Sequence, residues 1–114
     1  QPNVAEHFVR EWLMSHTYQI VEETVVSDNH RLYEIIVAEP SNEQVEYTEL
    51  ELKYGPILLQ QPSELSVAKW KRTNRKNKEI LEQLQKSKTP QHEKIEQFKK
   101  AFNELQGVID RANS

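Results

Sequence analysis

Apolar residues recur at helical spacing in the first sixteen positions of the chain. These positions lie three or four residues apart, or side by side, and predict one apolar face: Val4, Phe8, Val9, Trp12 and Leu13. Asn3 is a residue type that caps helices, and Glu6 follows three positions later, as in a capping box. We therefore expect a helix that begins after Asn3 and ends near His16.

Two stretches rich in β-branched residues follow this helix. They cover residues 18–26 and 31–40, and the turn-forming residues SDNH separate them. This pattern predicts an antiparallel hairpin whose second strand stops at Pro40. In the next segment, residues 41–62, we expect a packed connector with a short helix that is broken at Gly55-Pro56.

From Ser63 onward the pattern changes to that of two long helices. In the last segment, apolar residues alternate at spacings of three and four: Ile95, Phe98, Phe102, Leu105, Ile109 and Ala112. A weaker register with two asparagines precedes it: Val67, Trp70, Asn74, Asn77, Leu81 and Leu84. Thr89 is expected to cap the second helix and Pro90 to begin it. So short a connection predicts an antiparallel coiled-coil hairpin whose first arm, of about 25 residues, is roughly 38 Å long.

Charge divides the chain into two parts. Residues 1–60 hold eleven Asp and Glu against three Lys and Arg, about −8, and residues 61–114 hold seven against twelve, about +5. Six cations with no acid among them lie in residues 69–78: Lys69, Lys71, Arg72, Arg75, Lys76 and Lys78. Such a cluster indicates RNA binding, with Trp70 or the asparagines adding a stack or hydrogen bonds; a solvated helix face is the alternative. We expect two modules, residues 1–60 and 61–114.

Several kinds of chemistry are disfavoured. The chain has no cysteine, which excludes disulfides, thiolate zinc sites and cysteine nucleophiles. Its four histidines show no ligand spacing and no surrounding carboxylate pattern, so no metal is expected. Two glycines are too few for a glycine-rich nucleotide-binding loop. Glu22 and Glu23 are adjacent on a strand and should point to opposite faces, which disfavours them as an acid/base pair. Without a signal peptide or an apolar run of about 20 residues, we expect a cytoplasmic protein that does not contact a membrane.

The opening residues Gln1, Pro2 and Asn3 read as the end of a strand, a turn and a helix cap. As a cap alone, Asn3 needs no further role. A strand, a tight turn and a helix also form the carboxyl edge of an α/β sheet, where ligands bind. In that interpretation the strand lies before Gln1.

Six features occur in order along the chain: QPN, the helical REWL, the strand ending LYEIIVAEP, the connector YGPILL, Trp70 and the terminal helical hairpin. In this combination the chain resembles the C-terminal half of the bacterial tRNA (adenine(22)-N1)-methyltransferases. The resemblance covers essentially the whole chain. It implies an α/β fold: the C-terminal part of a Rossmann-like class I methyltransferase sheet, with a helix and an antiparallel β-hairpin, followed by an antiparallel two-helix coiled coil that grips tRNA. It also implies an S-adenosylmethionine-dependent enzyme that methylates N1 of an adenine in tRNA.

The resemblance further implies roles for particular residues. Asn3, with Gln1 and Pro2, becomes a candidate for the rim that contacts the target base or the cofactor, and the six cations become candidates for tRNA binding. The family's glycine-rich cofactor motif belongs to the N-terminal half, so this chain alone should be inactive and should need that half as a partner. The alternative is a non-enzymatic module whose coiled coil pairs with a protein.

Overall fold

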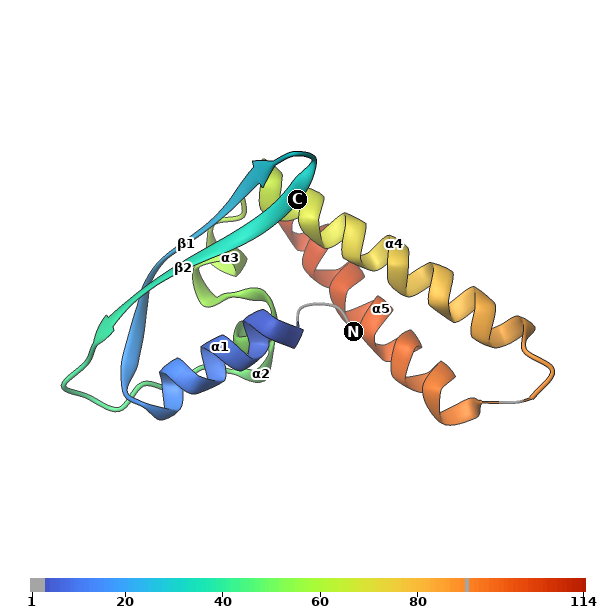
Figure 1. Ribbon diagram of the computed structural model, residues 1–114, viewed down its shortest axis with the longest axis horizontal. Helices are drawn as coiled ribbons and strands as arrows, with labels where there is room; N and C mark the ends of the chain where they lie inside the picture. Colours follow the sequence, from blue (N-terminus) through green and yellow to red (C-terminus); the bar gives the residue numbers. More distant parts are fainter. Residues whose placement is uncertain (1–3, 90) are drawn as a thin grey trace. The chain divides into compact units, whose positions relative to one another are not determined.

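The structure is a computed structural model that describes residues 4–89 and 91–114. It is an α/β structure, as predicted, with the elements in the order α1, β1, β2, α2, α3, α4 and α5 (Figure 1). The chain forms two compact units, residues 1–66 and 67–114, and the division falls inside helix α4. No helix in the described ranges has the length and apolar character needed to cross a bilayer.

Helix α1 (Val4–Ser15) is present where the periodicity predicted it. Phe8, Val9 and Trp12, from the predicted apolar face, are 63%, 47% and 52% exposed, whereas Arg10 is completely buried. Most of the predicted apolar face is therefore exposed, while its Leu13 is half-buried. The reason is that Arg10 reaches partners on three other elements, and these contacts turn its side of the helix inward. Asn3 and the side chain of Val4 lie outside the described residues.

The predicted hairpin is confirmed. Strands β1 (Tyr18–Asp28) and β2 (Arg31–Pro40) pair in antiparallel fashion and form a two-stranded sheet. Asn29 and His30 connect them with φ values of 50° and 66°. Positive φ at both central residues is what a tight two-residue hairpin turn requires, and Asn adopts it readily.

A register shift between Ile20 and Glu22 interrupts the regular alternation of β1. As a result Ile20, Glu23 and Val25 are buried, while Glu22 is exposed. The two adjacent glutamates thus differ in their surroundings as the sequence predicted. The other face of the sheet carries exposed apolar residues on β2: Tyr33, Ile35 and Val37.

Two short helices form the connector, α2 (Glu49–Tyr54) and α3 (Pro56–Gln60). A capping box begins α2: Thr48 Oγ1 accepts from the Glu51 amide at 3.2 Å, and Glu51 Oε1 accepts from the Thr48 amide at 2.8 Å. Gly55, at φ 100°, separates the two helices. The predicted break at Gly55-Pro56 is confirmed, and α3 is an additional helix that begins at this proline.

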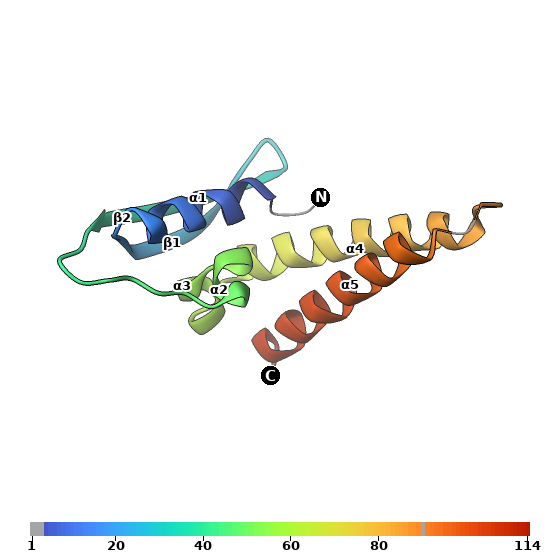
Figure 2. The same ribbon diagram turned by 90° about the horizontal axis from the view of Figure 1, so that it is seen from below.

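Helices α4 (Glu64–Lys86) and α5 (His92–Ala112) form the predicted antiparallel hairpin (Figure 2). Asn74 Nδ2 donates to Gln106 Oε1 at 3.2 Å and to the Phe102 carbonyl at 3.3 Å, which ties the two arms together. Every residue predicted for the two seams is buried or half-buried. The predicted cap is wrong: α5 begins at His92, after Gln91, and Pro90 lies outside the described residues.

Candidate functional site

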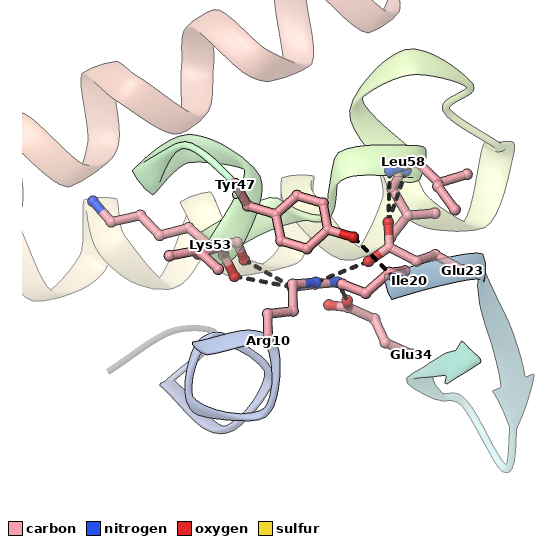
Figure 3. A network of polar contacts seen from close by, with 9 residues as sticks. Arg10, Ile20, Glu23, Glu34, Tyr47, Lys53 and Leu58 are labelled. Atoms are coloured by element: carbon pink, nitrogen blue, oxygen red, sulfur yellow. Dashed lines mark hydrogen bonds and ion pairs between the residues drawn. The ribbon is translucent and has the colours of Figure 1, made fainter. Parts of the chain in front are cut away.

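The guanidinium of Arg10 lies at the centre of a buried polar network in the first unit (Figure 3). Its Nε donates to Glu23 Oε2 at 2.8 Å, and its Nη2 donates to Glu34 Oε1. Its Nη1 donates to the carbonyl oxygens of Leu52 and Lys53, each at 3.3 Å. One side chain of α1 thus joins both strands and the last turn of α2.

Glu23 extends the network to α3. Its Oε1 accepts hydrogen bonds from the backbone amides of Ile57 at 2.8 Å and Leu58 at 3.1 Å. Gly55 lies against the same carboxylate: a Cβ at this position would lie 2.6 Å from Glu23 Oε1 and 2.9 Å from Arg10 Nη2. The close approach and the positive φ both require glycine here.

The network is a structural element because its polar groups are turned toward one another. The side chains of Arg10, Glu23 and Glu34 are 0%, 0% and 2% exposed, so the charges lie out of reach of a substrate. One cation lies between two carboxylates, and the amides that begin α3 offset part of the remaining negative charge.

Sequence reasoning missed this network, although the stretches REWL, LYEIIVAEP and YGPILL that carried the resemblance all contribute to it. Arg10, Glu34 and the Gly55–Leu58 segment come one from each of these stretches. Their separation in sequence gave no local signal.

The second unit carries the predicted basic cluster on α4. Lys69 is half-buried, and the other five cations are exposed: Lys71, Arg72, Arg75, Lys76 and Lys78. At 1.5 Å per residue these six residues, which we call the basic strip, extend over roughly 14 Å of helix. Neither Asp nor Glu occurs between Glu64 and Glu79, so no acidic residue interrupts the strip.

The neutral residues within the strip are used inside the hairpin. Trp70 is 1% exposed, and its predicted role as a stacking surface is therefore wrong. Asn74 donates to α5, and Asn77 Nδ2 donates to Asn74 Oδ1 at 3.2 Å. Trp70 and the asparagines thus face the seam, while five of the six cations of the strip are exposed.

One histidine has carboxylate neighbours. His7 Nε2 lies 2.9 Å from Glu11 Oε1 and 3.0 Å from Glu49 Oε1. The absence of a carboxylate pattern, expected from the sequence, does not hold for His7. The first three residues, Gln1, Pro2 and Asn3, lie outside the described part of the chain, so their predicted role remains a prediction.

Comparisons with known proteins identify relatives of the whole chain. The family model described as tRNA (adenine(22)-N(1))-methyltransferase matches residues 1–107. A curated Bacillus subtilis (strain 168) protein with this description is 28% identical over 116 residues, which cover 96% of this chain and 49% of the relative. The chain therefore spans about half the length of the curated relative it matches.

Solved structures agree with this match. A Streptococcus pneumoniae protein in complex with S-adenosyl-L-methionine is 26% identical, with a TM-score of 0.78, covering 95% of this chain and 44% of that one. A Streptococcus agalactiae protein of the NADB-Rossmann superfamily is 24% identical, with a TM-score of 0.80, covering 95% of this chain and 45% of that one. These likenesses place the fold among Rossmann-like proteins. Because the family model matches nearly all of the chain, the chain belongs to the tRNA (adenine(22)-N(1))-methyltransferase family.

Proposed function

We propose that this chain is the C-terminal part of an S-adenosylmethionine-dependent enzyme that methylates N1 of an adenine in tRNA, adenine 22 by the family's description. The observation that carries the proposal is the family match over residues 1–107. The basic strip on α4 supports it, because an enzyme that acts on tRNA needs contacts to phosphates.

The described residues include no glycine-rich loop of the kind that holds a nucleotide. Of the two glycines, Gly55 is packed against the Arg10 and Glu23 side chains, and Gly107 lies within α5, so neither forms an open loop for a nucleotide. We therefore propose that the part of the family fold that this chain does not match binds most of the cofactor. On this proposal the chain alone neither binds the methyl donor nor transfers a methyl group.

Exposed apolar surface on the first unit supports an association with that other part. Phe8 and Trp12 of α1 and Tyr33, Ile35 and Val37 of β2 are all more than 40% exposed. A two-stranded sheet with an open edge and an uncovered apolar face is marginal by itself. A strand of that other part that pairs with this hairpin would cover the open edge.

The proposed reaction demands positioning more than acid or base catalysis. Adenine N1 carries a lone pair, so attack on a sulfonium methyl group depends chiefly on alignment. N1 also lies on the Watson–Crick edge, so the base has to be unpaired or extruded before it can react. The side-chain amides of Gln1 and Asn3 are our candidates for contacts to that edge.

Asn3→Ala in the complete enzyme tests the role of this residue. If Asn3 positions the base, the variant loses methyl transfer while its free energy of unfolding falls only by the value of a helix cap, about 1 kcal/mol. Normal methyl transfer with reduced stability would show that Asn3 is only a cap.

The basic strip is tested by the salt dependence of tRNA binding. Replacing Arg72, Arg75 and Lys76 with glutamine should reduce the slope of log K against log salt by about 2, since each lost phosphate contact removes roughly 0.7–0.9. Substituting Lys94, Lys99 and Lys100 of α5 with glutamine makes the same change of net charge and is the matched control. A slope unchanged by the first set, or reduced equally by both, would refute a specific role for the strip.

A further inference from the structure

Three potential metal ligands meet where α1 packs against α2. His7 and Glu11 lie one helical turn apart on α1, and Glu49 is the first residue of α2. The imidazole Nε2 and one oxygen of each carboxylate lie within 4.8 Å of one another. This group lies outside the Arg10 network, and the proposed methyl transfer does not use it.

Hydrogen bonding does not account for the position of the His7 ring. Nε2 is buried and makes no hydrogen bond with any described residue, although carboxylate oxygens lie 2.9 Å and 3.0 Å away. Both oxygens are nevertheless within ion-pair distance of this nitrogen. Two ligands that lie at right angles around one ion, with bonds of about 2.1 Å, are separated by about 3.0 Å. The two distances from His7 Nε2 match this spacing, and all three atoms lie within 4.8 Å of one another.

The helices that carry these ligands are fixed to each other. Arg10 of α1 donates to the carbonyl oxygens of Leu52 and Lys53 in α2, and the Thr48 capping box holds the first turn of α2, where Glu49 lies. The backbone positions of the three ligands are thus set by contacts that do not depend on an ion.

From these observations we infer that His7, Glu11 and Glu49 bind one divalent transition-metal ion. A neutral imidazole with two carboxylates carries a charge of about −2, which a divalent ion neutralises. A nitrogen ligand favours Mn²⁺, Fe²⁺ or Zn²⁺ over Mg²⁺ and Ca²⁺, which prefer oxygen alone. Glu11 and Glu49, but not His7, line a hollow of about 530 Å³, so water can reach the two carboxylates.

Metal titration of the chelator-treated chain tests this inference. Mn²⁺, followed by electron paramagnetic resonance, and Zn²⁺, followed by calorimetry, should each bind at one site per chain. His7→Gln, Glu11→Gln and Glu49→Gln should each weaken binding by at least about tenfold, since even the loss of an outer-shell partner costs that much. His16→Gln and Glu39→Gln remove the same groups elsewhere and should leave the affinity unchanged.

A measurement on the unmodified chain makes the result independent of variant folding. Imidazole NMR signals of His7 should shift on addition of Zn²⁺, while those of His16, His30 and His92 should not. The inference is wrong if no saturable binding occurs up to about 1 mM metal. It is equally wrong if His7→Gln binds as tightly as the unmodified chain, or if the shifted signals belong to another histidine.

Discussion

Glu23→Gln should destabilise the first unit strongly, because the buried carboxylate of Glu23 connects Arg10 of α1 to the backbone of α3. Its side chain is fully buried, and its carboxylate accepts hydrogen bonds from Arg10 Nε, the Ile57 amide and the Leu58 amide. Glutamine keeps one carbonyl oxygen for the two amides. It removes the negative charge and places an NH₂ group against the Arg10 guanidinium.

The size of the loss in unfolding free energy depends on the hydrogen-bond acceptors that Arg10 retains in the variant. Removing one partner of a buried ion pair costs about 3–5 kcal/mol. Glu34 still accepts from Arg10, as do the two α2 carbonyls, so we expect the lower end, about 3 kcal/mol. That is a large part of the 5–15 kcal/mol typical of a whole domain.

Urea unfolding, followed by far-UV circular dichroism, measures this loss. With a slope of about 2 kcal/mol per M, a loss of about 3 kcal/mol lowers the midpoint by roughly 1.5 M. Glu22→Gln removes the same charge from the adjacent, exposed residue and should change the unfolding free energy by no more than about 0.5 kcal/mol. Equal midpoint shifts for the two variants would mean that net charge, and not the buried network, accounts for the effect.

Three further substitutions test other parts of the fold by the same urea midpoints. Gly55→Ala should cost at least about 2 kcal/mol, because it forces a positive φ and places a Cβ against two charged groups. Gly107→Ala, whose Cβ would meet its closest atom at 3.5 Å, should instead stabilise α5 by about 0.5–1 kcal/mol; a loss there would show that the helix packs more tightly than described. Asn74→Ala should cost about 1–3 kcal/mol, because Asn77 Nδ2 loses its acceptor, whereas leucine at both positions should restore the stability of the unmodified chain. Failure of the double substitution to do so would mean that the hydrogen bonds from Asn74 to Phe102 and Gln106 are also needed for stability.

Features that depend on local sequence could be predicted from the sequence. The β-hairpin follows from β-branched runs around a turn sequence, and the break at Gly55-Pro56 follows from residues that cannot continue a helix. The basic strip was predictable because helical periodicity separates Lys71 and Arg75 from the seam residue Asn74. All of these depend on residues close together in the chain.

The orientation of α1 could not be predicted in the same way. Periodicity shows that a helix is amphipathic, but not which side the rest of the protein covers. The apolar side with Phe8 and Trp12 is exposed here, while Arg10 turns inward because its partners come from β1, β2 and α2. Those partners lie 13 to 43 residues away, beyond the reach of any local pattern.

The register shift in β1 decides whether the network can form at all. Regular alternation from the buried Ile20 would place Glu22 and Thr24 inward and Glu23 outward. The irregularity between Ile20 and Glu22 reverses this, so Glu23 and Val25 turn inward and Glu22 pairs with Val37 across the strands. An extra residue in a strand, typical of a β-bulge, has this effect because it moves every later side chain to the other face. The bulge therefore brings Glu23 to Arg10 and α3, and in this way it helps to join α1, the hairpin and the connector into a single unit.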